Sequence, residues 1–156
     1  MAGARLAFQP SLKGRALRLL SRREHTRSEL ERKLRAFEET PGTLAQALDE
    51  LEARGFLSEQ RAAESLLHRR AGQLGAARLR REMQDKGLAR ELIEQSLAGL
   101  KDSELARARE VWRRKFENPA ATPQERARQT RFLLGRGFSA QVVRRVLGSS
   151  PEDDLD

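Results

Sequence analysis

Two short segments of the chain are near copies of each other, and they constrain the fold more than any other feature. The glycines of Lys86-Gly87-Leu88 and Arg136-Gly137-Phe138 are each followed by an apolar pair at +5 and +6 and a leucine at +10. A cation, a glycine and a large apolar residue between two helical patterns predict a helix end, a turn and the next helix. Because this unit occurs twice, the chain is predicted to be a repeat protein that works through an extended surface and not through one catalytic pocket.

Composition favours an all-α protein. Apolar residues make up 38% and charged residues 35% of the 156 residues, which is little for one compact core and suits several small helical units. Leu, Ala, Arg and Glu are strong helix formers, and β-branched residues are few. The chain has no cysteine, which excludes disulfides and thiolate metal sites and fits a reducing compartment. No apolar run reaches the ~20 residues of a membrane span and no signal-peptide pattern is present, so we expect a cytoplasmic protein without a membrane partner.

The net charge of +8 is unevenly distributed along the chain. Residues 61–90 carry eight cations and three anions, and residues 105–146 carry eleven and three, whereas residues 24–60 carry five cations and nine anions. Strongly basic helices indicate a polyanion or an acidic protein as partner. The alternative is an ordinary solvated charged face, but the excess gathers in particular segments and so favours a functional surface.

Helix start and stop signals divide the chain into three units of three helices. The predicted repeats cover residues 12–57, 58–100 and 101–148, between a flexible arm at 1–11 and an acidic tail at 149–156. The first repeat should have a stripe of Leu30, Leu34 and Phe37 in its core. Capping boxes are expected at Thr26/Glu29, Thr43/Gln46 and Thr122/Glu125, and further helix caps at Ser58, Asp102 and Ser139.

No constellation of residues predicts catalysis. His25 and His68 lack the Cys, Ser or Asp neighbours of a catalytic arrangement, and we interpret both as surface residues. No phosphate-cradling glycine loop occurs, and most carboxylates stand where helix stabilisation explains them. We therefore expect neither an enzyme nor a metal ion or cofactor.

The basic helices are the candidate binding residues. Arginine forks suit phosphate and carboxylate equally well, so spacing alone does not choose between DNA and an acidic protein. Trp112 and Phe116 are interpreted as core, because aromatic residues are too scarce for a base-stacking track. The candidates are Arg69, Arg70, Arg78, Arg80, Arg81, Lys86, Arg113, Arg114, Lys115, Arg128, Arg131, Arg136, Arg144 and Arg145.

An ordered series of motifs from about Leu12 to Leu147 resembles the RecX family, the small regulators of the RecA recombinase. Each motif is weak by itself, but their order is fairly specific. One departure is Gly75-Ala76, where the family often has Gly-Pro, and another is Ser58-Glu59 with Ala62, where it often has an aspartate pair and a phenylalanine. The motifs are Ala16-Leu17-Arg18-Leu19-Leu20, Arg23-Glu24-His25-Thr26, Glu29-Leu30, Lys33-Leu34, residues 51–57, Ala63-Glu64-Ser65, Arg80-Arg81-Glu82-Met83, Lys86-Gly87-Leu88, Arg114-Lys115-Phe116, Arg131-Phe132-Leu133 and Arg136-Gly137-Phe138.

The resemblance implies an elongated, curved array of three three-helix repeats and a partner, the RecA–DNA filament, bound in its helical groove. It also implies restraint of filament growth, ATP hydrolysis and strand exchange, and so a part in recombination, DNA repair and the SOS response. It supplies no sharply defined site residues, so the basic set remains a physical prediction. We expect a monomer that contacts RecA and, through phosphates, single- or double-stranded DNA. The alternative is a helix-turn-helix transcription regulator, whose recognition helix 139–147 would offer Gln141, Arg144 and Arg145 to base edges.

Overall fold

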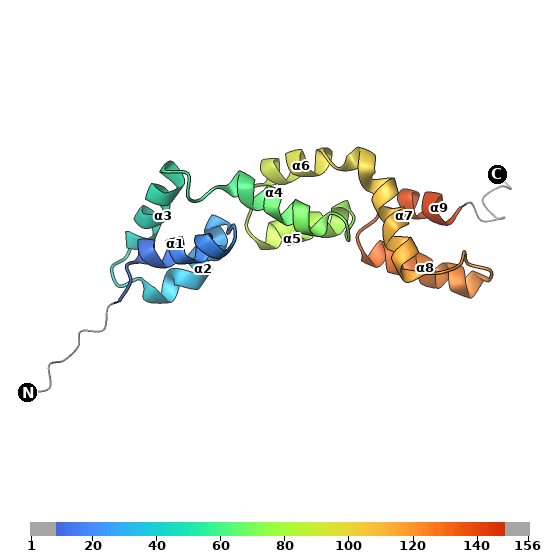
Figure 1. Ribbon diagram of the computed structural model, residues 1–156, viewed down its shortest axis with the longest axis horizontal. Coiled ribbons are helices and arrows are strands. Elements are labelled where there is room, and N and C mark those ends of the chain that lie inside the picture. Colours follow the sequence, from blue (N-terminus) through green and yellow to red (C-terminus); the bar gives the residue numbers. More distant parts are fainter. Residues whose placement is uncertain (1–8, 149–156) are drawn as a thin grey trace, which may run out of the picture. The chain divides into compact units, whose positions relative to one another are not determined.

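The computed structural model describes residues 9–148, which form nine α-helices and two 3₁₀ helices without a β-strand (Figure 1). The all-α prediction is confirmed over that range. The chain divides into two compact units, Met1–Ala62 and Ala63–Asp156. The predicted acidic tail and the first eight residues of the predicted arm lie outside the described residues.

The first unit packs three α-helices around one core. Its elements are α1 (Leu12–Arg22), α2 (Arg27–Leu34), a 3₁₀ turn η1 (Arg35–Phe37) and α3 (Thr43–Ala53). Helix α1 contacts both α2 and α3, and α2 contacts α3. The core consists of Ala16, Leu30, Leu34, Leu44, Leu48, Leu51 and Leu57.

Phe37 does not join this core, so the predicted stripe of three residues is wrong at its last position. The α-helix ends at Leu34, and the chain then tightens into the 3₁₀ turn. Phe37 is the last residue of that turn, and the chain leaves it in an extended conformation at Glu38. Its side chain is 47% exposed, and the Arg15 guanidinium lies 3.9 Å from the ring centre.

The capping prediction is confirmed at some helix starts and wrong at others. Thr26 and Glu29 form the expected box, and Ser58, Thr122 and Ser139 each accept from a backbone amide three residues ahead. The box at Thr122 is incomplete, because Glu125 accepts from the Ala121 amide and not from that of the cap residue.

The expected cap at Thr43 is wrong, because Gly42, with φ of 91°, occupies the cap position and Thr43 is already helical. The Thr43 hydroxyl donates to the Thr40 carbonyl, and the Glu38 carboxylate accepts from the Leu44 amide at 2.8 Å. The cap expected at Asp102 is also wrong, since Asp102 lies in a 3₁₀ turn before the next helix. Both corrections arise where a turn of the preceding chain shifts the helix start.

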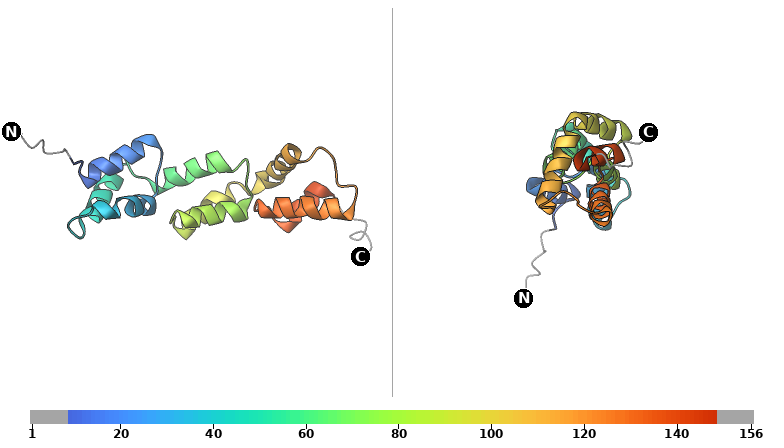
Figure 2. Two further views of the ribbon diagram at one scale, coloured as in Figure 1. Left: turned by 90° about the horizontal axis from the view of Figure 1, so that it is seen from below. Right: turned by 90° about the vertical axis from the view of Figure 1, so that its right-hand side faces the viewer.

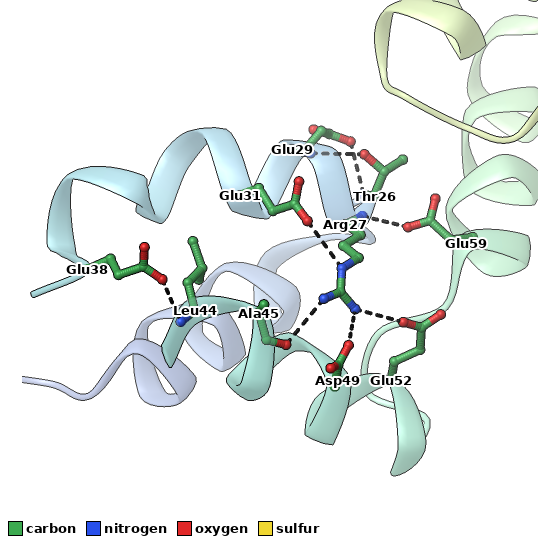
Figure 3. A network of polar contacts seen from close by, with 10 residues as sticks. All are labelled: Thr26, Arg27, Glu29, Glu31, Glu38, Leu44, Ala45, Asp49, Glu52 and Glu59. Carbon is green, nitrogen blue, oxygen red and sulfur yellow. Dashed lines mark hydrogen bonds and ion pairs between the residues drawn. The ribbon is translucent and has the colours of Figure 1, made fainter. Parts of the chain in front are cut away.

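Arg27 joins α2 to α3 in the first unit (Figure 3). Its guanidinium donates to Glu31 at 3.2 Å, to Asp49 at 2.7 Å and to Glu52 at 3.2 Å. It also donates to the Ala45 carbonyl, so one side chain of α2 bonds four groups, three of them on α3. Its backbone amide donates to the Glu59 carboxylate, which adds the first turn of the following helix to the network.

The second unit contains the remaining two repeats and has two core clusters. Its elements are α4 (Glu59–Arg70), which begins in the first unit, α5 (Ala76–Asp85), α6 (Arg90–Ala98), η2 (Lys101–Ser103), α7 (Glu104–Lys115), α8 (Pro123–Gly135) and α9 (Ala140–Leu147). Figures 1 and 2 show α7, α8 and α9 side by side, each contacting the other two. One cluster contains Ala63, Leu66, Leu74, Leu79, Met83, Leu88, Ile93 and Leu97; the other contains Ala108, Val111, Leu133, Phe138 and Val143.

The two copies of the glycine turn have the same geometry. Gly87 and Gly137 have φ of 76° and 93°, a left-handed conformation that costs glycine little. The next amide reaches back to the carbonyl five residues earlier, from Leu88 to Met83 at 3.2 Å and from Phe138 to Leu133 at 3.3 Å. This pattern satisfies carbonyls at a helix C-terminus and places the following apolar residue in the core. The sequence prediction of repeated helix–turn–helix units is confirmed.

The glycine turn of the third repeat packs directly against the start of α5. The Gly75 amide donates to the Arg136 carbonyl at 2.8 Å, and the Ala77 amide donates to the Gly137 carbonyl at 3.2 Å. A β-carbon on Gly75 would collide with the backbone of Gly137, and one on Gly137 would lie 2.5 Å from the amide nitrogen of Arg78. We call this backbone approach the Gly75–Gly137 contact, and it joins the second repeat to the third.

Candidate interaction surface

Some of the basic residues predicted to bind a partner are occupied inside the protein. Arg70, at the end of α4, donates to both carboxylate oxygens of Glu82 at 2.8 and 3.2 Å. Arg80 makes the same two-fold contact with Glu94, joining α5 to α6 at 2.9 and 3.2 Å. Each carboxylate raises the pKa of its arginine. These two arginines therefore stabilise the second repeat.

Three other predicted residues come together at the α8–α9 turn. Arg78 of α5 donates to the Gly135 carbonyl at 3.1 Å. The Arg136 guanidinium and the Lys115 ammonium lie 5.2 and 5.6 Å from the ring centre of Phe132. Cations near an aromatic face are attracted by its negative quadrupole. Cations from α5, α7 and the end of α8 thus gather around this turn, although the sequence places them far apart.

Arg113 and Arg114 end α7 on a largely exposed surface. Both are paired with Glu110 at 3.6 Å, and their side chains are 66% and 64% exposed. Such exposed pairs contribute little to stability, on the order of 0–1 kcal/mol. Either arginine can exchange this carboxylate for one on a partner at small cost.

A third set is exposed and makes no hydrogen bond or ion pair within residues 9–148. The members lie on α5, on one face of α8 and on α9, where the apolar residues of each helix face the core. Unpaired exposed guanidinium groups retain all their donors for a phosphate or carboxylate. We call them the unpaired arginines: Arg81, Arg128, Arg131, Arg144 and Arg145.

The last two candidates have local roles. Arg69 is exposed on α4 and donates to the Ser65 carbonyl of its own helix at 3.3 Å. Lys86 is half-buried and caps the C-terminus of α5, directly before the Gly87 turn. Neither lies at a feature that singles it out as a contact residue.

Two arginines outside the predicted set have structural roles that the sequence did not indicate. Arg107 of α7 donates to the carbonyls of Ala71 and Leu74, each at 2.8 Å, and to that of Leu100 at 3.3 Å. Burial lowers the pKa of Arg107, as expected for a cation removed from water. Arg27 has the network described above. Glu31 is four residues from Arg27 on the same helix, but the other partners of Arg27 lie on α3 and the carbonyls that Arg107 bonds lie outside α7, so sequence spacing does not reveal these contacts.

The two histidines differ in burial. His68 is exposed, as expected, but His25 is only 2% exposed, so its interpretation as a surface residue is wrong. Its Nδ1 lies 3.0 Å from the Arg23 carbonyl and therefore donates, which leaves Nε2 to accept from Lys33 at 3.3 Å. Burial is the main cause that lowers the His25 pKa, and a lowered pKa favours the neutral ring. The residue immediately before a helix cap packs here as a core residue.

The described part of the chain holds no cluster of three or more potential metal ligands among His, Cys, Asp and Glu. Within the same range, no helix is both long and apolar enough to cross a membrane. What the structure does present is exposed positive charge on the helices of the second unit. Guanidinium groups have the donors that hydrogen-bond to phosphate and carboxylate groups.

Profiles of three consecutive RecX domains match the chain along most of its length. They are the first three-helix domain at residues 13–51, the second at 58–97 and the third at 102–147. The chain belongs to the RecX family. Proteins named Regulatory protein RecX are similar to it: that of Leptothrix cholodnii is 52% identical over 139 residues, 89% of this chain and 88% of its own length. That of Ralstonia nicotianae is 48% identical over 143 residues, 91% of this chain and 90% of its own.

A solved structure has the same fold. The crystal structure of RecX from Lactobacillus salivarius matches with a TM-score of 0.75 and covers 93% of this chain and 96% of its own, at 20% identity. At that identity the likeness concerns the fold alone. Family membership thus comes from the sequence relatives, and the tandem three-helix architecture is common to the structures.

Proposed function

We propose that the protein binds the RecA–DNA filament in its helical groove and restrains filament extension, ATP hydrolysis and strand exchange. It would thereby modulate recombination, DNA repair and the SOS response. Family membership supports the choice of RecA as partner. The proposal assigns the protein a regulatory role without catalysis of its own.

The exposure of the unpaired arginines is the observation on which we base the choice of contact surface. Binding requires a basic group to leave its current partner, and Arg70 and Arg80 would each leave a two-fold contact with a carboxylate. The unpaired arginines have no hydrogen-bond or ion-pair partner to leave within residues 9–148. Arg128 and Arg131, three residues apart on exposed α8, and the adjacent Arg144 and Arg145 on α9 are therefore the first candidates for contact.

The partner groups are carboxylates of RecA, phosphates of the bound DNA, or both. Contacts with DNA phosphate release counterions, so DNA affinity would fall steeply with salt and show no preference for base sequence. Binding of the purified protein to random and defined duplexes at several salt concentrations measures this component. A strong preference for one duplex sequence would instead support a transcription regulator and contradict the proposal.

The main test measures DNA-dependent ATP hydrolysis by RecA with increasing amounts of the protein. We expect suppression well below one-to-one stoichiometry. The double variants Arg128→Glu/Arg131→Glu and Arg144→Glu/Arg145→Glu should raise the half-inhibiting concentration about tenfold, equivalent to about 1.4 kcal/mol of binding free energy. Far-UV circular dichroism should remain unchanged, because these exposed side chains make no hydrogen bond or ion pair within residues 9–148.

A matched control changes the net charge equally at another exposed site. Arg18 and Arg22 are exposed on α1, and Arg18→Glu/Arg22→Glu should retain nearly normal inhibition. If the control and both test variants lose activity equally, general charge and not the proposed surface determines binding. If the unmodified protein at equimolar amounts leaves RecA's hydrolysis rate and filament length unchanged, the proposed function is wrong.

A further inference from the structure

A groove of about 270 Å³ runs between α8 and α9. From α8 it is lined by Arg126, Thr130 and Leu134, which are spaced four residues apart and so form one stripe of the helix. From α9 it is lined by Ala140, Val143, Arg144 and Leu147, again one helical face. The groove therefore has a largely apolar wall on α9, two arginines, and no carboxylate in its lining.

Leu134 is the exposed apolar side chain of this groove. It is 44% exposed, whereas the neighbouring Leu133 is fully buried in the core below. A large apolar side chain left half in water gains free energy when a second apolar group covers it. The groove thus matches a segment that combines a leucine-sized apolar group with carboxylates for Arg126 and Arg144.

Arg126 also fixes the point at which the chain leaves α9. Its guanidinium donates to the Gly148 carbonyl at 2.7 Å and reaches the Leu147 carbonyl at 3.5 Å. Gly148 has φ of 81°, which lets the chain change direction at this position. The residue that holds the chain exit is thus itself part of the groove lining.

The segment that follows has the matching chemistry. Residues 149–156 contain four carboxylates, a single leucine, Leu155, and no cation. We propose that the α8–α9 groove binds this segment, with Leu155 against Leu134 and its acidic neighbours paired with Arg126 and Arg144. Leu155 is seven positions beyond Gly148, and a chain of that length can span ~20 Å, more than the ~12 Å length of α9. Attachment to α9 gives the segment a millimolar effective concentration, which favours it over a free ligand of the same composition.

The bound segment would cover part of the positive charge on α9 and so act as a built-in competitor. This consequence alone rests on the proposed function, because it assumes that Arg144 contributes to RecA binding. Occupation of the groove does not depend on RecA and can be measured without it.

The test uses a fluorescent synthetic peptide with the sequence of residues 149–156 and follows its anisotropy on titration with protein. We expect the peptide to bind a variant that lacks residues 149–156 at least tenfold more tightly than it binds the full chain, because the full chain already fills its groove. The full-chain variant Leu155→Asp should behave like the shortened one. Raising the salt concentration should weaken binding, since charge pairing contributes.

Two protein variants and one control locate the site. In the shortened protein, Leu134→Ser and Arg144→Ala should each weaken peptide binding several-fold, whereas Arg113→Ala, an exposed arginine outside the groove, should have no effect. Circular dichroism verifies that every variant retains its helices. Absence of peptide binding to the shortened protein would overturn the proposal. Equal binding to the full and shortened chains would overturn it too, because the groove would then be open to a ligand from another molecule.

Discussion

Replacing Gly137 with alanine tests whether the Gly75–Gly137 contact makes the second and third repeats one cooperative unit. An alanine at this position meets two separate costs. The left-handed conformation, with φ of 93°, costs a residue with a β-carbon about 1–2 kcal/mol. The new β-carbon would also lie 2.5 Å from the Arg78 amide nitrogen, so the turn must move away from α5.

That movement breaks the hydrogen bonds from the Gly75 and Ala77 amides to the turn. Ala77 is exposed and can bond to water, but Gly75 is buried, and an unsatisfied buried amide costs about 1–3 kcal/mol. The expected loss in unfolding free energy is therefore about 2–5 kcal/mol. For a unit of roughly 100 residues, each kcal/mol lowers Tm by about 4–8 °C.

The matched control is Gly87→Ala in the other copy of the turn. Gly87 has φ of 76° but is exposed, so only the conformational cost of about 1–2 kcal/mol is expected. Both variants can be followed in urea by the fluorescence of Trp112, the chain's single tryptophan, which lies in the same unit. Equal losses in the two variants would refute the idea that the Gly75–Gly137 contact stabilises the unit.

Two further predictions concern the first unit. Arg27→Ala should lower the unfolding free energy of this unit by roughly 2 kcal/mol, because three carboxylates lose their shared cation and repel one another. Urea unfolding followed by circular dichroism measures this loss. Arg35 is exposed, so the control variant Arg35→Ala should change the unfolding free energy little. His25 has a folded-state pKa below its ordinary value, so its contribution to stability is present above that value and is lost as pH falls toward the folded pKa. Between pH 7.5 and 5, the unfolding free energy should fall more for the natural chain than for His25→Gln, and parallel curves would contradict this. The raised pKa of Glu59 changes the unfolding free energy in the opposite direction, but equally in both proteins.

The fold was predictable from sequence wherever a local signal determines the backbone. The helix starts at Thr26 and Ser139 follow from a side chain that bonds an amide three residues ahead. The starts expected at Thr43 and Asp102 were wrong because competing local turns, ending at Gly42 and Ser103, took precedence. The residue types at these positions are compatible with either helix start, and only the packed chain shows which one forms.

The candidate surface was predictable only as a set of cations. Arg80 and Arg81 are adjacent in sequence. Arg80 on α5 bonds Glu94 on α6, whereas Arg81 has no hydrogen-bond or ion-pair partner within residues 9–148. Arg70 and Arg107 likewise have partners on other elements. An arginine's availability for a ligand depends on which carboxylate or carbonyl lies opposite it, and that is a non-local property.

The sequence by itself determined the all-helical class, the repeat and the left-handed turns at Gly87 and Gly137, because helix propensity, capping and glycine geometry act over a few neighbouring residues. The sequence contains no signal that predicts which of these two turns is buried. Gly87 remains exposed, while Gly137 is buried against the backbone of α5. Only the tertiary structure decided this difference, because it depends on two backbone segments some sixty residues apart approaching until no β-carbon fits between them.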